Sequence, residues 1–63
     1  MNLKEARFKK SFTQYDVWLK TGIPQSRISL FERGYALPND EEKMKLAKAL
    51  DVQINVLEFS TRE

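Results

Sequence analysis

Hydrophobic positions along this chain recur every three or four residues, and short polar segments interrupt the pattern. Such spacing is typical of amphipathic α-helices, and no segment shows the strict alternation that predicts a strand. The pattern predicts helices at about residues 3–10, 14–21, 24–33 and 40–50, and a short fifth helix at about 53–58. Because the connections are short and the chain has only 63 residues, we expect a compact all-α bundle of five helices.

Polar residues and glycines mark where these helices begin and end. Asn2, Thr13 and Asn39 each precede a helical segment, and each is followed three residues later by Glu or Asp. Asn and Thr side chains accept hydrogen bonds from the free amides of a first helical turn, and acidic side chains favour the positive end of the helix dipole. Gly22 and Gly34 follow the second and third segments, where glycine can adopt the left-handed conformation that ends many helices.

The apolar face of each predicted helix indicates the core. The residues that we expect inside are Leu3 and Ala6 with Arg7 on the same face, then Val17, Ile23, Ile28, Phe31, Met44, Leu46, Ala47, Leu50, Ile54 and Leu57. Lys43, Lys45 and Lys48 are expected to point to solvent from the opposite face of the fourth helix.

Composition excludes several kinds of chemistry. The chain has no cysteine and no histidine, so it has no disulfide, no thiolate zinc site and no histidine general base. We therefore expect no cofactor, no metal site and no catalytic residues. The longest uncharged run is too short to cross a bilayer, and the N-terminus lacks the apolar stretch of a secretion signal. These features predict a soluble, cytoplasmic protein.

Charge is distributed unevenly along the chain. Residues 1–34 hold seven basic and three acidic side chains, whereas residues 35–63 hold four basic and six acidic ones. A positive half joined to a negative half suits a protein that turns one end toward a polyanion. The alternative is an ordinary scatter of solvated charge.

The segment 13–29 is the most informative part of the chain. It contains two short amphipathic helices that are separated by Gly22, and Ile28 is placed to fill the space between them with Val17 and Ile23 beside it. Two helices joined by a tight glycine turn form a helix-turn-helix, which places its second helix in the major groove of DNA.

Several further motifs stand at matching positions around this segment. They are Thr13-Gln14, Gly22, Gln25-Ser26, Ile28-Ser29, Phe31-Glu32-Arg33-Gly34 and Leu46-Ala47-Lys48-Ala49-Leu50. Over residues 3–59 the chain resembles the phage repressor and Cro family, also called lambda-repressor-like. The resemblance implies a five-helix domain that binds double-stranded DNA, usually as a homodimer on a two-fold related operator. We assign the domain to residues 1–59 and expect residues 60–63 to be a frayed end or the start of a linker.

The outer row of the third helix supplies the candidate base-reading residues. The Gln25 amide can pair with both edge atoms of adenine, and Ser26 and Ser29 can reach base edges or phosphates. Leu30 can contact a thymine methyl group, and Arg27 can reach a phosphate or a guanine. Outside this motif, the same row would be read as a solvated helix face.

A second set of residues is expected to contact the DNA backbone or to support the motif. Gln14 opens the second helix, where free amides favour a phosphate, and the resemblance suggests that it braces Gln25. Its neighbours Thr13 and Tyr15 are assigned to the backbone set, as are Arg33 and Tyr35 beyond the third helix. The resemblance also implies that Arg7 pairs with Glu32 and faces a phosphate; the alternative is two unrelated surface charges.

Trp18 departs from the family, which usually has a small residue at this helix crossing. We expect the indole in the core or at the rim of the bundle, against Tyr15 or Phe8, rather than in a partner site. Val56 and Phe59 are expected to be partly exposed, like Phe8 and Tyr15. An apolar patch on the fifth helix would suit a dimer interface or a missing domain, and scattered apolar side chains are the equal alternative.

The sequence suits three functions to different degrees. The first is sequence-specific DNA binding, as a transcriptional repressor or regulator of a phage or mobile element. The second is a protein-interaction module, such as an antitoxin or coregulator, that uses the same fold. The third, an enzyme, is disfavoured because capping explains Asp40, Glu41 and Glu42 and no nucleophile–base pair is visible.

Overall fold

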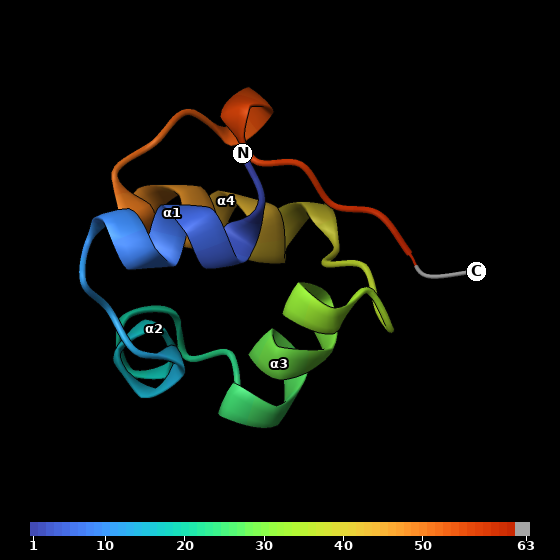
Figure 1. Cartoon of the computed structure of the whole chain (residues 1–63), viewed down its shortest axis with the longest axis horizontal. Helices are drawn as coiled ribbons and strands as arrows, with labels where there is room; N and C mark the ends of the chain where they lie inside the picture. Colours follow the sequence, from blue (N-terminus) through green and yellow to red (C-terminus); the bar gives the residue numbers. More distant parts are fainter. Residues whose placement is uncertain (62–63) are drawn as a thin grey trace.

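The computed structural model describes residues 1–61, and within them the chain is helical (Figure 1). The elements are α1 (Leu3–Lys9), α2 (Gln14–Thr21), α3 (Gln25–Arg33), α4 (Asp40–Leu50) and η1 (Ile54–Val56). The all-α fold is therefore confirmed. The fifth element is a single 3₁₀ turn rather than a helix over residues 53–58. An isolated parallel bridge joins Asn2 to Glu58. Of the segment 60–63, which was expected to be a frayed end or the start of a linker, residues 62 and 63 lie outside the described residues.

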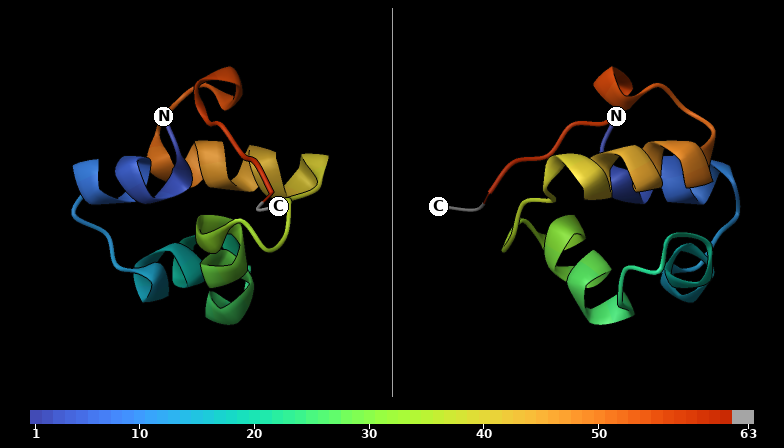
Figure 2. Two further views of the ribbon diagram at one scale, coloured as in Figure 1. Left: turned by 45° about the vertical axis from the view of Figure 1, so that its right-hand side comes forward. Right: turned by 180° about the vertical axis from the view of Figure 1, so that it is seen from behind.

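The helices form two levels. α1 and α4 run through one level, and α2 and α3 lie together on the same side of them, as the turned views also show (Figure 2). α2 packs against both α3 and α4, and η1 packs against α4. The N-terminus lies beside η1, on the side of the molecule away from α3 (Figure 1). This arrangement leaves α3 at an outer edge of the molecule.

Local capping determines the helix boundaries. The side chains of Asn2, Thr13 and Asn39 each accept a hydrogen bond from the backbone N–H three residues later, and each acidic side chain at that position accepts one in return. These three capping boxes satisfy amides that would otherwise lack partners. Gly22 (φ 77°) and Gly34 (φ 79°) end α2 and α3 in the left-handed conformation, as predicted.

The core is built from one face of each helix. The buried side chains are Leu3, Ala6, Val17, Ile23, Ile28, Phe31, Leu46, Ala47, Leu50 and Leu57, together with the polar residues Arg7 and Thr21. This agrees with the predicted core except at two positions in α4 and η1. Within the described residues, no helix is long and apolar enough to cross a membrane.

The prediction that Met44 and Ile54 are buried is wrong. Met44 is 65% exposed, and Ile54 is 44% exposed. α4 packs on α2 and η1 through Leu46, Ala47 and Leu50. Because these three residues form the centre of its buried face, Met44 lies on the outer side of the helix. The same orientation of α4 about its axis leaves Lys43 half-buried, whereas the sequence predicted that it points to solvent. η1 ends at Val56 and Leu57 follows it in an extended conformation (φ −81°, ψ 125°), so Ile54 and Leu57 do not share one helical face.

Candidate nucleic-acid interface

The turn between α2 and α3 is held by local hydrogen bonds and by apolar packing. The hydroxyl of Thr21 donates to the Val17 carbonyl (2.7 Å) and accepts from the Ile23 amide (3.1 Å). Val17, Ile23 and Ile28 are almost completely buried, so Ile28 fills the helix crossing as predicted. A Cβ at Gly22 would meet no atom within 4 Å, which means that the positive φ, not space, favours glycine there. Sequence reasoning missed Thr21, whose only signal was its place beside the glycine.

The outer row of α3 is open to solvent. Gln25 and Ser26 are exposed at the beginning of the helix, and Ser29 and Leu30 are half-buried further along it. Ile28 and Phe31 face the core. On the opposite face of α3, side chains that are three or four residues apart in the sequence form one continuous row. The row contains four of the five residues that the sequence assigned to base reading, because Arg27 does not lie in it, and it ends at the exposed Arg33, which was assigned to the DNA backbone.

A buried ion pair joins α1 to the end of α3. Arg7 donates from Nε to Glu32 Oε2 (2.7 Å) and from Nη2 to Glu32 Oε1 (2.9 Å), and its Nη1 donates to the Phe12 carbonyl (3.0 Å). The side chains of Arg7 and Glu32 are only 9% and 4% exposed. The hydrogen bond to Glu32 raises the pKa of Arg7 above its ordinary value, although burial acts in the opposite direction. The expected pair is therefore confirmed, and it lies inside the domain.

Gln14 joins the same network. Its Nε2 donates to Glu32 Oε1 (3.2 Å), so the amide binds the ion pair. The resemblance had suggested Gln25 as its partner instead. A carboxylate is a stronger acceptor than an amide oxygen, which favours this partner. The first residue of α2 is thereby tied to both α1 and α3, and Gln25 is left to face solvent.

Arg27 is bound to α4. Its Nε and Nη2 donate to the two carboxylate oxygens of Glu42, with an Nη2–Oε1 distance of 3.0 Å, and its guanidinium lies 4.9 Å from the centroid of the Phe31 ring. The hydrogen bond from Arg27 is the main reason that the pKa of Glu42 is lowered, and the same bond raises the pKa of Arg27. The sequence assigned Arg27 to DNA, whereas the structure pairs it with a residue 15 positions away.

The remaining candidates for backbone contact lie at the two ends of the motif. The Arg33 guanidinium lies 5.3 Å from the centroid of the Tyr35 ring, and both side chains are exposed. At the other end, the Thr13 hydroxyl accepts from the Asp16 amide (3.0 Å), so it is used in the helix cap.

Trp18 lies at the rim of the bundle. It is 41% exposed and meets the exposed Tyr15 in an edge-to-face contact, with 5.7 Å between ring centroids and 83° between ring planes. The indole therefore points from the rim of the bundle toward solvent. Of the two expected neighbours, Tyr15 is the one that it contacts.

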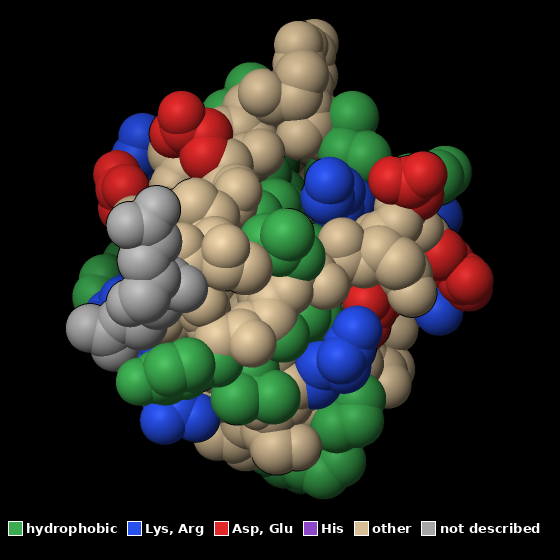
Figure 3. All heavy atoms as spheres, turned by 90° about the vertical axis from the view of Figure 1, so that its right-hand side faces the viewer, with side chains coloured by type: hydrophobic (Ala, Val, Ile, Leu, Met, Phe, Trp, Pro, Cys, Tyr) green, Lys and Arg blue, Asp and Glu red, His purple; other side chains and the backbone are tan. Residues whose placement is uncertain are grey.

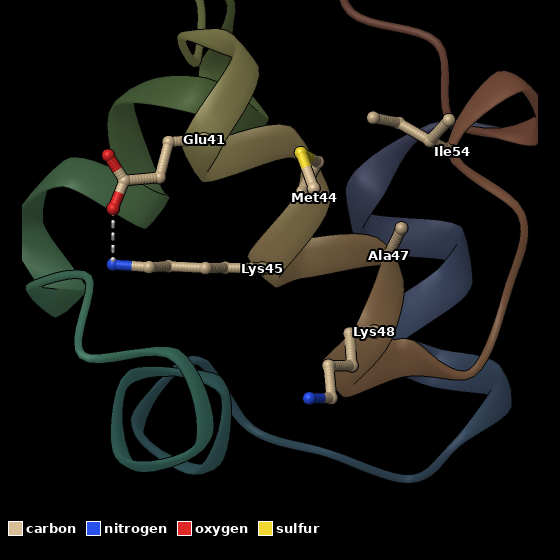
Figure 4. Close-up of a pocket in the computed structure, with 6 residues that line it drawn as sticks. All are labelled: Glu41, Met44, Lys45, Ala47, Lys48 and Ile54. Carbon is tan, nitrogen blue, oxygen red and sulfur yellow. Dashed lines mark ion pairs between the residues drawn. The ribbon is translucent and has the colours of Figure 1, made fainter.

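Charged and apolar side chains are mixed on the side of the molecule that faces the viewer in Figure 3. A separate groove of about 480 Å³ lies between α4 and η1 and is lined by Glu41, Met44, Lys45, Ala47, Lys48 and Ile54 (Figure 4). In residues 1–61, no cluster of three metal-ligating side chains is present. The groove and the outer row of α3 are therefore both candidate surfaces for a partner.

Comparison with known proteins agrees with this geometry. A family model described as helix-turn-helix matches residues 3–57. A similar solved structure is the high-resolution crystal structure of the restriction-modification controller protein C.AhdI from Aeromonas hydrophila, with 30% sequence identity and a TM-score of 0.81. The match covers 84% of this chain and 80% of that chain. A search of curated proteins found no match.

Proposed function

Because the chain belongs to the helix-turn-helix family of the phage repressor and Cro type and binds DNA in a sequence-specific manner, we propose that it regulates transcription of a phage or mobile element in the cytoplasm. The observation that carries this proposal is the outer row of α3, which is open while both flanks of the helix are held by Arg–Glu pairs. A rigid helix with a free polar row suits insertion into the major groove. The likeness to a controller protein supports the regulatory role.

Base reading is proposed for Gln25, Ser26, Ser29 and Leu30. Gln25 and Ser26 lie exposed at the first turn of α3, where the residues of a recognition helix usually meet base edges. The Gln25 amide can make a bidentate contact with adenine that discriminates by about 1–3 kcal/mol.

Phosphate contacts are proposed for the N-terminus of α2 and for the segment beyond α3. Gln14 opens α2 with its side chain already fixed by Glu32, and Arg33 and Tyr35 stack together beyond the base-reading row. Thr13 and Tyr15 flank Gln14 and belong to the same set, and Arg7 retains N–H groups beyond the three that it uses within the protein. Arg7 and Arg33 are the cations of this set, so neutralisation of one phosphate by each gives log affinity a slope of about −1.8 per monomer against log salt.

The protein is proposed to act as a homodimer through the groove between α4 and η1. One such domain buries only about 600–1,000 Å² on DNA, so tight operator binding favours two copies on half-sites about 34 Å apart. Met44 and Ile54 expose apolar surface at the groove, with Val56 close by in η1. Glu41 and Lys48 lie seven residues apart on the same face of α4, on either side of Met44 (Figure 4). An antiparallel pairing of two α4 helices about a two-fold axis places each Glu41 beside the other Lys48.

A charge exchange tests the dimer. Glu41→Lys is expected to weaken self-association measured by analytical ultracentrifugation, because it places like charges across the two-fold axis. Glu41→Lys combined with Lys48→Glu restores opposite charges and is expected to restore the dimer. If the double variant stays as weak as the single one, α4 does not form the interface.

The DNA proposal is tested by selection from a randomised duplex library at physiological salt with non-specific competitor. An inverted repeat is expected, and Gln25→Ala is expected to erase preference at one base pair of each half-site while non-specific binding stays almost unchanged. Gln53→Ala, an exposed glutamine outside the motif, is the matched control. Uniform weakening on all sequences by Gln25→Ala would contradict its role as a base reader.

A protein-interaction module, such as an antitoxin or coregulator, is the second candidate. The exposed Tyr15, Trp18 and Leu19 on α2 favour it, because large apolar side chains at one helix face suit a partner surface. If the library yields no enriched sequence, this face becomes the first site to mutate in a search for protein partners.

A further inference from the structure

Arg27 is the basic side chain next to the base-reading residues, yet its hydrogen bonds go to the protein. Two of its nitrogens bind the two oxygens of Glu42, and its guanidinium lies over the Phe31 ring. A bidentate pair fixes both the distance and the plane of a guanidinium. The side chain is therefore directed from α3 toward the beginning of α4.

Glu42 is itself held in place. Its Oε1 accepts from the Asn39 amide (2.9 Å), and its own amide donates to Asn39 Oδ1 (2.8 Å), which completes the cap of α4. The side chain is only 13% exposed. Because the carboxylate is part of the helix cap, it cannot follow Arg27 toward a DNA molecule without opening that cap.

The balance of interactions opposes release of Arg27 to DNA. A phosphate contact would replace one charge-assisted bidentate bond by another and would give up the Phe31 contact. It would also leave the Glu42 carboxylate without its cation beside a polyanion, which is unfavourable. The exchange therefore loses one interaction and gains none.

We propose that Glu42 is a specificity-determining residue that acts by keeping Arg27 away from DNA. The inference rests on the proposed binding of DNA through α3. With Arg27 withheld, the first two turns of the recognition helix read DNA through Gln25, Ser26, Ser29 and Leu30, without a positive charge among them. Arg27 is then a positioning residue that ties α3 to α4. Neutralising Glu42 frees Arg27 to contact a phosphate or a guanine.

The test compares Glu42→Gln, Arg27→Ala and the double variant with the wild-type chain. Gln keeps the acceptor that the α4 cap needs but removes the charge, so the fold is retained, as thermal melting by circular dichroism can verify. The readouts are the slope of log affinity against log salt on the selected operator and the base preferences that selection from the duplex library returns. Arg27→Ala is expected to leave the slope unchanged, and Glu42→Gln is expected to steepen it by about 0.9 per freed arginine that reaches a phosphate. The double variant is expected to return to the wild-type slope.

The double variant separates the freed arginine from a simple loss of negative charge. If it keeps the steeper slope of Glu42→Gln, Arg27 plays no part and the proposal is wrong. If Arg27→Ala alone lowers the slope by about 0.9 or erases a base preference, Arg27 already contacts DNA and the proposal is also wrong. Absence of DNA binding by the wild-type chain would instead contradict the proposed function on which the inference rests.

Discussion

Two Arg–Glu pairs hold the recognition helix, one on each flank, and they differ in burial. Arg7–Glu32 joins α1 to the end of α3 with side chains 9% and 4% exposed, whereas Arg27–Glu42 joins the beginning of α3 to α4 with side chains 41% and 13% exposed. Both pairs are bidentate. The same chemistry therefore occurs in two environments on one nine-residue helix.

The difference in burial assigns different roles to the two pairs. A buried charge that loses its partner carries a large desolvation penalty, so removal of one partner of Arg7–Glu32 is expected to destabilise the domain strongly. A half-exposed pair contributes less to stability and is screened by salt. Arg27–Glu42 therefore acts mainly on where the Arg27 charge is placed, and we expect its loss to change DNA recognition more than folding.

The largest expected effect follows from removing the buried carboxylate. Glu32→Ala leaves the Arg7 guanidinium buried without its partner and deprives Gln14 of its acceptor, so we expect a loss of about 3–5 kcal/mol in the free energy of unfolding. Chemical denaturation measures this loss. Lys10→Ala, which breaks the exposed pair with Asp51, is the control and is expected to change stability by no more than about 0.5 kcal/mol. Equal effects for the two variants would show that burial of the first pair has no energetic consequence.

A smaller effect is expected on the other flank. Glu42→Gln breaks the ion pair but keeps the cap, so its loss of stability should be less than about a third of that caused by Glu32→Ala. Raising the salt concentration should shrink the effect of Glu42→Gln and leave that of Glu32→Ala almost unchanged. Denaturation series at low and high salt check both statements. If the loss of stability caused by Glu42→Gln did not depend on salt, the two ion pairs would not differ in their screening by solvent.

The smallest effect concerns pH. The pKa of Glu42 is below its ordinary value of 4.5, chiefly because Arg27 donates to the carboxylate and also because the Asn39 amide does. A carboxyl with a lowered pKa in the folded state binds fewer protons than in the unfolded state, so its contribution is present above the ordinary value and is lost as pH falls through the lowered one. The stability difference between wild type and Glu42→Gln is thus expected to be constant near neutral pH and to shrink below about pH 4.5. A difference that persists unchanged in strong acid would contradict a charge-based pair.

Much of the fold could be predicted because its determinants are local. The caps at Asn2, Thr13 and Asn39 act over three residues, and the glycine stops at Gly22 and Gly34 act at a single residue. Such signals are readable without knowledge of the tertiary structure. The helix-turn-helix and the exposed positions of Gln25 and Ser26 followed from the same local pattern.

The sequence by itself determined the four helices, their caps, the turn at Gly22 and the family to which the chain belongs. Only the tertiary structure decided that Gln14 binds Glu32, that Arg27 binds Glu42 and that Met44 faces outward. The physical reason is one of range. Capping depends on neighbours along the chain, whereas ion-pair partners and the rotation of a helix depend on the angles at which helices cross, which arise from packing the whole core.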